Sequence, residues 1–456
     1  MQPINWQQFG LKKDPYDTVP LVEGGDLPIE KAFIGRQQEK SFLDSLFEST
    51  DRACLTICGD VGVGKTSLVN FNKFIWKYRT PKLLFSFRRE IEANGELLNK
   101  RAFLIEIIGS VLREIKLLDP NLLKNDLLMK INQVVDINQS IAFSAGINYN
   151  NIGFSGSREK IFSQPAQFSV ATLEGYFNDL IDFIKNHEIR GNKYSGLIVH
   201  VNNFDVVLSD PETKKKAVVF FGEIRDMLQI PNVYYLFLGP NNLFKDIIST
   251  QQRVKGIFVQ TPLRVKPLSK SEIVAALNER LEILKSDDVS KVIKPVEDNV
   301  VFRLYDLYEG DIRSIMTAIG AILSQCSEKL AHALTEDEAM LLLGQERWNN
   351  IETVIKLTDE QKEILKYLAT AHKFISQKEI ASMFNKAQSN TSSYYFKPLR
   401  DNNIIEEKER KGKVIYYGLT QHYTPLQWLL DAKTNLNREM KEKVEQLSLP
   451  RNKLGI

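Results

Sequence analysis

The stretch CGDVGVGKTSLV, residues Cys58 to Val69, decides the fold of this 456-residue chain. The apolar run Ala53 to Cys58 leads into the stretch, and an amphipathic segment from Thr66 to Tyr78 leads out of it. A buried strand, a glycine-rich turn and a helix, in this order, are the context in which the spacing G-x4-G-K-T holds phosphate groups. The stretch therefore predicts a phosphate-binding loop.

Short apolar runs continue along the chain and alternate with longer amphipathic stretches: KLLFSF, GLIVHV, NVYYLFL and GIFVQT. Continuous apolar runs of this length are typical of parallel strands that are buried on both faces of a sheet. Together with the run before the loop they predict an α/β core, residues 51–264, built on a parallel five-stranded sheet.

One stretch of the core departs from this alternation. Residues 141–157 alternate apolar and small polar side chains around Asn150 and Asn151, after a helical segment from about Lys100 to Val135. This pattern predicts a β-hairpin inserted into the core. The hairpin is either a structural flap or a contact for another subunit or for nucleic acid.

The predicted loop has the chemistry of a nucleoside triphosphate site with Mg²⁺. Glycines let backbone N–H groups wrap the phosphates, the start of the helix adds positive potential, and Lys65 supplies a cation. The hydroxyl oxygen of Thr66 is the expected protein ligand of Mg²⁺. The residues expected to contact the nucleotide here are Gly59, Asp60, Val61, Gly62, Val63, Gly64, Lys65, Thr66 and Ser67.

Composition limits the class of protein without naming a partner. The chain is 43% hydrophobic and 26% charged, as soluble globular proteins are, and its formal charge is only +3. Any nucleic-acid contact must therefore come from a local patch and not from a global field. Three cysteines without metal-ligand spacing favour a reducing compartment, and no secretion signal or membrane span is evident. We expect a cytoplasmic protein.

Changes of pattern divide the rest of the chain. Residues 1–50 form an N-terminal segment that begins with an extended leader. After the core, residues 265–350 carry apolar residues at helical spacing and predict an α-helical bundle, called the helical lid below. Residues 355–420 form a further domain, and residues 421–456 are expected to form an amphipathic helix and a tail.

The loop, together with FIGRQQE at Phe33 to Glu39, resembles the AAA+ ATPase family. FGLKKDPYD at Phe9 to Asp17 is similar to the leader of the origin-recognition and initiator branch and of its bacterial relatives in transposition, secretion and defence. The resemblance covers residues 9 to about 420 and implies ATP with Mg²⁺ as the ligand. It also implies that Phe33, Ile34, Gly35 and Arg36 lie near the adenine.

The run LIVHV departs from this family, because Asn202 and Asn203 follow it where the family has Asp and then Asp or Glu. Asn202 can still face the metal site, but an amide brings no charge to offset Mg²⁺. Asn203 occupies the catalytic position and cannot accept a proton from water. Hydrolysis is therefore slow or absent, unless Asp205 or a residue of a neighbouring subunit supplies the missing carboxylate. His200, within the run, is expected in the core.

The resemblance implies three further functional residues. Asn241, or failing that Asn242, would contact the γ-phosphate or the attacking water from the end of a strand. Arg313 in EGDIRS resembles the Gly-Asp-x-Arg sensor, which reaches from the lid to the phosphates. Arg253, or Arg225, is the candidate finger for a neighbouring subunit.

Residues 357–420 read as three helices followed by a two-stranded wing that turns at Lys411 and Gly412, with Ser376 capping the second helix. The order resembles a winged helix-turn-helix, which implies a third helix in the major groove of DNA and a wing on the backbone. The residues expected to face DNA are Ser389, Asn390, Thr391, Tyr394, Tyr395, Lys397, Arg410, Lys411 and Lys413. Glutamates in the wing leave a protein-binding role open.

These features predict an ATP-binding switch, a slow or weak ATPase, that couples its nucleotide state to double-stranded DNA binding or to self-assembly. The alternative is a signalling or defence scaffold with structural ATP and a protein-binding winged helix. A motor with fast turnover is disfavoured by Asn202 and Asn203.

Overall fold

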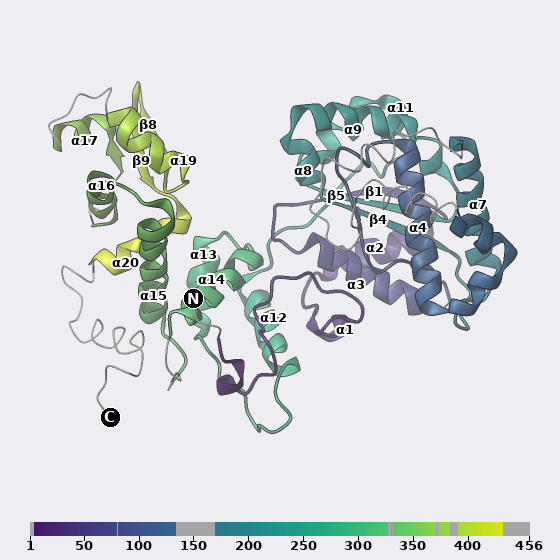
Figure 1. Cartoon of the computed structure of the whole chain (residues 1–456), viewed down its shortest axis with the longest axis horizontal. Helices are drawn as coiled ribbons and strands as arrows, with labels where there is room; N and C mark the ends of the chain where they lie inside the picture. Colours follow the sequence, from purple (N-terminus) through teal and green to yellow (C-terminus); the bar gives the residue numbers. More distant parts are fainter. Residues whose placement is uncertain are drawn as a thin grey trace. The chain divides into compact units, whose positions relative to one another are not determined.

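The computed structural model describes residues 4–79, 81–133, 169–326, 330, 332–370, 374–383 and 391–431. The chain divides into two compact units (Figure 1). One unit is Pro20–Lys266, and the other combines Met1–Val19 with Pro267–Ile456.

The unit Pro20–Lys266 is built on a parallel sheet in the order β2-β4-β5-β1-β6, with the short β3 paired to β4. The strands are β1 (Ala53–Cys58), β2 (Leu84–Ser86), β3 (Ile91–Glu92), β4 (Gly196–Asn202), β5 (Val233–Gly239) and β6 (Leu263–Arg264). The predicted α/β class and parallel sheet are confirmed, and the sheet has six strands where five were expected.

The last predicted strand, GIFVQT, was misplaced. Within it Phe258 makes only an isolated bridge to Cys54, and the pairing with β1 resumes at β6. Pro262 separates the two and has no N–H to donate to the ladder, so the strand begins only after it.

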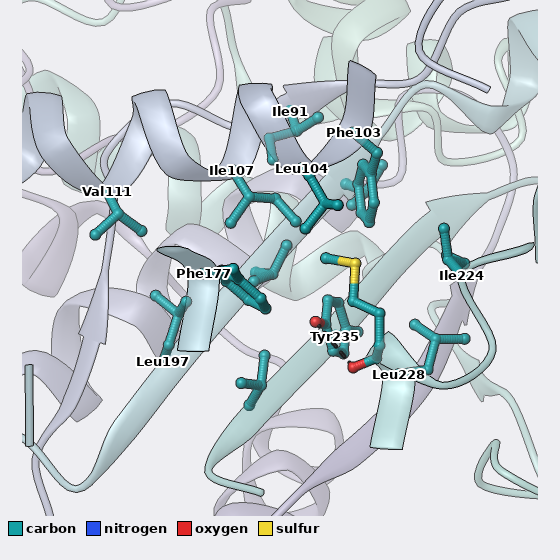
Figure 2. Packing of buried hydrophobic residues seen from close by; sticks show 14 of the residues in the cluster. Ile91, Phe103, Leu104, Ile107, Val111, Phe177, Leu197, Ile224, Leu228 and Tyr235 are labelled. Carbon is teal, nitrogen blue, oxygen red and sulfur yellow. Dashed lines mark hydrogen bonds between the residues drawn. The ribbon is translucent and has the colours of Figure 1, made fainter. Parts of the chain in front are cut away.

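Helices cover both faces of this sheet. They are α1 (Ile29–Ala32), α2 (Gln37–Ser49), α3 (Lys65–Tyr78), α4 (Lys100–Leu118), α7 (Val170–Asn186), α8 (Phe204–Ser209), α9 (Pro211–Glu223), α10 (Leu243–Asp246) and α11 (Gln252–Lys255). On one face, Leu104 and Ile107 of α4 and Phe177 of α7 lie over Leu197 of β4 and Tyr235 of β5 (Figure 2). Helices α2 and α3 pack on the opposite face.

The helical segment predicted from Lys100 to Val135 is broken. Helix α4 ends at Leu118, and a 3-10 turn, Pro120–Lys124, separates it from helical residues 126–133. The side chain of Asp119 caps the turn, and Pro120 at its start cannot continue the ladder of α4. The hairpin predicted at 141–157 lies outside the described residues.

The other unit begins with the predicted helical lid. Its helices are α12 (Lys270–Ile283), α13 (Asp298–Leu307), α14 (Ile312–Ser324) and α15 (Glu336–Asn350). The leader lies along this lid: the N–H of Lys12 donates to the carbonyl of Leu284 at 2.8 Å, and the N–H of Ile293 donates to that of Phe9 at 3.0 Å. The leader thus belongs with the lid as far as Val19.

The same unit ends in a winged helix. Helix α16 (Asp359–Thr370), β7 (Ile375–Ser376), α17 (Gln377–Met383), a π turn with α19 (Thr391–Phe396, Lys397–Asp401), β8 (Ile405–Lys411) and β9 (Val414–Leu419) follow in that order. Ser376 caps α17 as predicted, by a reciprocal exchange with Glu379. The wing turns at Gly412 and Lys413, one residue later than expected, because Lys411 still pairs with Val414.

Helix α20 (Leu426–Asp431) packs against α15, and residues 432–456 lie outside the described part. Among the described residues, no helix has the length and apolar character needed to cross a membrane.

Candidate nucleotide site and nucleic-acid interface

The carboxyl ends of three neighbouring strands bring the predicted nucleotide residues to one edge of the sheet. Cys58 at the end of β1 pairs with Gly239 at the end of β5, and Val201 of β4 pairs with Phe237. The loop after β1, Asn202 at the end of β4 and the polar residues after β5 therefore lie together. Ligands of open parallel sheets bind at this edge.

Glycines give the loop its shape. Gly62 and Gly64 have left-handed φ values of 81° and 90°, which glycine adopts without strain. A Cβ on Gly59 would lie 2.5 Å from the carbonyl oxygen of Val265, so no side chain fits there. Gly64 is also the N-cap of α3, and no side chain caps that helix. The first N–H groups of α3 thus suit an anion.

Lys65 folds back over the loop. Its Nζ donates to the carbonyl oxygens of Gly59 at 2.7 Å and Asp60 at 2.8 Å, and its side chain is buried. These are neutral acceptors, so phosphate oxygens at the loop would be stronger partners for the ammonium group. The loop, Lys65 and the uncapped start of α3 together fit a nucleoside triphosphate.

Asn202 reaches the residue expected to ligate the metal. Its Nδ2 donates to Oγ1 of Thr66 at 3.0 Å. Turning the amide by half a turn would place its oxygen against the hydroxyl instead, but neither orientation brings negative charge. No cluster of three or more acidic, histidine or cysteine side chains that could hold a metal occurs in the described part of the chain.

Asn203 differs from Asn202 in its backbone. Its φ of 68° is left-handed, and it is the residue from which α8 starts. Asparagine tolerates this conformation better than most residues. Asp205 follows in the first turn of α8 and is partly exposed, so its proposed takeover of the missing carboxylate stays a prediction.

His200 is fully buried in β4, as predicted for a core residue. Neither of its ring nitrogens has a hydrogen-bond partner among the described residues. Burial, together with the nearby charge of Lys73, holds the pKa of His200 well below its ordinary value. The imidazole is therefore neutral at physiological pH.

The structure distinguishes the two asparagines after β5. Nδ2 of Asn241 donates to Oδ1 of Asp60 in the loop at 2.9 Å. Asn242 instead donates to Asp246 within α10 at 2.8 Å. Asn241 is therefore the one of the two that contacts the phosphate loop.

Arg36 links the FIGRQQE element to the loop. Gly35 and Arg36 both have left-handed backbones, and the guanidinium of Arg36 is buried. Its Nη2 donates to the carbonyl of Val63 at 2.6 Å, and its Nη1 donates to the carbonyl of Lys266. Arg36 thus joins the loop to the last residue of the unit.

Phe33 of the same element lies against α3. The ring of Phe33 stacks on that of Phe71 with centroids 4.6 Å apart, and Lys40 lies over both rings. Ile34 is half-buried beside Phe33. Phe71 belongs to no motif, so the sequence did not indicate it. Its stacking partner, Phe33, is distant in sequence.

Ser67 was expected to contact the nucleotide, but its side chain is engaged elsewhere. Its Oγ accepts a hydrogen bond from the N–H of Leu21 at 3.2 Å, and Nδ2 of Asn70, about one helical turn further, donates to the carbonyl of Leu21 at 3.0 Å. The hydroxyl hydrogen and the backbone N–H of Ser67 are not used by this bond, so its contact with the nucleotide stays a prediction. Val61, at the tip of the loop, is exposed.

Two of the candidate arginines lie on helices, and Arg225 lies in the turn after α9. Arg313 is exposed in the first turn of α14, which Asp311 caps, and it belongs to the unit of the lid. Arg253 is exposed on α11, whereas Arg225 forms an ion pair with Asp226. The sensor and finger roles of these arginines stay predictions.

The predicted DNA face of the third helix needs correction. Thr391 is 0% exposed and Tyr395 is 9% exposed, because both point into the core of the winged helix with Leu399. Residues 391, 395 and 399 are four apart and share one face of the helical segment. Tyr394, 69% exposed, and Lys397 lie on the other face. Ser389 and Asn390 lie outside the described residues.

Arg400, which the sequence reading missed, is also exposed on this outer face, with its guanidinium 5.7 Å from the ring of Tyr417. The outer face of the third helix therefore offers Tyr394, Lys397 and Arg400.

Most basic residues of the wing have a carboxylate partner. Arg410 contacts Glu407 through two hydrogen bonds of 2.8 and 3.0 Å, and Lys411 lies 3.3 Å from Glu409. The contact with Arg410 lowers the pKa of Glu407. Lys413 is exposed at the tip of the wing. The wing is thus a strip of mixed charge and not a basic patch.

Comparison with known proteins finds similarity only among solved structures. No protein-family model and no curated protein matches the chain. The ORC2 protein of Aeropyrum pernix, in its ADPNP and ADP complexes, is 14% identical, with 96% of this chain and 99% of that chain covered and a TM-score of 0.46. Cdc6p of Pyrobaculum aerophilum is 16% identical, with 95% and 99% covered and a TM-score of 0.41.

A third solved structure, the ORC1 protein of Aeropyrum pernix in complex with DNA, is 12% identical, with 89% of this chain and 94% of that chain covered and a TM-score of 0.41. The three alignments span 89% to 96% of this chain. Identities this low concern the fold alone, and the α/β sheet of this chain is established by its own strand order.

Proposed function

We propose that the chain is an ATP-binding switch of the AAA+ type, slow in hydrolysis, that couples its nucleotide state to binding of double-stranded DNA. The observation that carries the proposal is the contact between Asn202 and Thr66. In this contact an amide, and not a carboxylate, faces the Thr66 hydroxyl that is expected to ligate Mg²⁺. The adjacent phosphate loop has the other features of a triphosphate site.

Several contacts support nucleotide binding. The left-handed glycines, the uncapped start of α3 and the ammonium group of Lys65 converge on one edge of the sheet. Thr66 would hold Mg²⁺ with the phosphates, and the ion would offset part of their negative charge. Phe33, Ile34, Gly35 and Arg36 would lie on the adenine side, and Asn241 would face the terminal phosphate.

Slow hydrolysis follows from the chemistry of two amides. Asn202 brings no charge to the metal site, so Mg²⁺ should be held more weakly than beside a carboxylate. Asn203 cannot take a proton from the attacking water. Asp205 in the first turn of α8, or a residue of a neighbouring subunit, would have to supply the missing carboxylate.

DNA is the proposed partner of the winged helix. Tyr394, Lys397 and Arg400 form an outward face on the third helix, and Lys413 marks the tip of the wing. The ion pairs of Arg410 and Lys411 are exposed, and such pairs contribute little to stability. Phosphates could therefore replace Glu407 and Glu409 as partners at little cost.

The test measures DNA affinity as a function of nucleotide. We expect random-sequence double-stranded DNA to bind at least about fivefold differently with Mg-ATP than without it, a value at the low end of ordinary coupling between sites. Lys65→Ala should abolish both ATP binding and this difference. Lys215→Ala, which removes an exposed lysine of α9, is the matched control and should change neither.

The outcomes separate the two candidate functions. Equal DNA affinity with and without bound ATP would contradict the switch. ATP binding without any DNA binding would favour the second candidate, a scaffold whose winged helix binds a protein, which the glutamates of the wing support.

A further inference from the structure

Arg36 holds the phosphate loop and the end of its unit with one guanidinium. Val63, whose carbonyl accepts from Nη2, lies between the two left-handed glycines of the loop. Lys266, whose carbonyl accepts from Nη1, is the last residue of the unit. A movement of Val63 when the loop binds phosphate would therefore act on the same buried group that fixes Lys266.

The next residue, Pro267, begins the second part of the other unit and rests on the turn before α14. A Cβ on Gly310 would lie 2.6 Å from the Cβ of Pro267 and 3.1 Å from the ring of Tyr305. Glu309 and Gly310 both have left-handed backbones, with φ values of 50° and 78°. This tight turn leads directly to the cap of α14 and to Arg313.

The same turn contacts the residues that follow the wing. Nε2 of Gln421 donates to Oε1 of Glu309 at 2.8 Å, and the ring of His422 lies 6.4 Å from that of Tyr308. The segment is fixed to the winged helix on its other side, because the N–H of Thr420 donates to the carbonyl of Ile404 at 2.9 Å. One turn thus contacts both Pro267 and the segment that directly follows the wing.

We propose that these contacts form a relay that carries the state of the phosphate loop to the winged helix, an inference that rests on the proposed function. Its members are Val63, Arg36, Lys266, Pro267, Gly310, Glu309 and Gln421. Each contact lies within one unit, and the peptide bond between Lys266 and Pro267 joins the two. Arg36 and Gln421 are positioning residues here, since neither needs to touch the nucleotide or the DNA.

The test uses the exposed end of the relay, because changes at Arg36 could also disturb the loop. Affinities for Mg-ATP and for random-sequence double-stranded DNA, the latter with and without Mg-ATP, are measured for wild type, Gln421→Ala, Glu309→Ala and the double variant. Gln252→Ala, an exposed glutamine of α11, is the matched control. The ratio of the two DNA affinities reports the coupling.

We expect both single variants to keep the wild-type affinity for Mg-ATP and for DNA without nucleotide. The coupling ratio of each single variant should fall by about fivefold, as expected for the loss of one hydrogen bond. The ratio of the double variant should fall no further, because the two substitutions remove the same hydrogen bond. A wild-type ratio that persists in both single variants would overturn the relay and leave the switch standing. A ratio of one in the wild type would overturn both.

Discussion

Asn202 and Asn203 are neighbours in sequence but differ in what they contribute: a side-chain contact in one and a backbone conformation in the other. Asn202 contacts the hydroxyl of Thr66, whereas Asn203 adopts a left-handed backbone that starts α8. A glutamate at position 203 would be strained, since this conformation costs most residues about 1–2 kcal/mol. A carboxylate is therefore better restored at Asn202, where the backbone belongs to a regular strand.

His200 provides a pH test of the core beneath α3. The pKa of His200 in the folded chain lies well below the ordinary value. At acid pH the unfolded chain therefore binds a proton at this residue that the folded chain does not bind. The free energy of unfolding consequently falls as the pH drops below about 6.5. The free energy of unfolding of His200→Leu should therefore rise relative to that of wild type between pH 8 and pH 5, by at most about 2 kcal/mol, which is the limit set by protonation of the unfolded imidazole. Urea unfolding at both pH values measures this gain.

An equal difference between His200→Leu and wild type at the two pH values would show that His200 takes up a proton in the folded state. His187, which is partly exposed and stacks on Phe183, offers a control. His187→Leu should not reproduce the gain.

Residue types and spacing indicated which residues lie near the phosphate loop better than they indicated where each side chain points. The spacing around Lys65 and Thr66 was sufficient to predict the loop, because glycine, lysine and threonine have few other reasons to occur together between a strand and a helix. The choice between Asn241 and Asn242 depends on the path of the chain after β5, which residue spacing does not specify.

At the scale of elements, the contact of α15 with α20 depends on one glycine. A Cβ on Gly344 would lie 2.5 Å from the carbonyl oxygen of Pro425 and 3.1 Å from the Cβ of Leu429. Gly344→Ala should therefore force α20 away from α15 and destabilise this unit by about 1–3 kcal/mol, as overpacking does. Chemical denaturation of the full chain measures the change.

Gly320 of α14 is the matched control, because a Cβ there would meet no atom within 4 Å. Gly320→Ala should stabilise the helix by up to about 1 kcal/mol, the difference between alanine and glycine in a helix interior. Equal effects of the two substitutions would contradict the packing described for α15 and α20.

The order of the elements was predictable, because the spacing of apolar residues and the capping residues lie within the segment that forms each helix or strand. The lid helices and the three helices of the winged domain follow from spacing, and Ser376 caps α17 as its sequence indicates. The inward face of the third helix was not predicted, since the polar appearance of Thr391 and Tyr395 conceals their burial. The last strand of the sheet was misplaced because its pairing resumes only after Pro262.

At the scale of the whole molecule, the leader divides between the two units. Residues up to Val19 belong with the lid, where Arg280 donates to the carbonyls of Pro15 and Asp17. Leu21, by contrast, is bonded to Ser67 and Asn70 of α3. The sequence could not predict this division, because most of these bonds involve backbone atoms of the leader, which are the same for every residue type.

ATP turnover with Mg²⁺ measures how long ATP stays intact at this site. Wild type, Asn202→Asp and an Asp205→Ala control are compared, each with and without double-stranded DNA. We predict negligible turnover in the wild type and at least a tenfold rise in Asn202→Asp, because a charge returns beside Thr66. Wild-type turnover of about 1 per second or faster, lost in Asp205→Ala and not raised by Asn202→Asp, would contradict slow hydrolysis at this site.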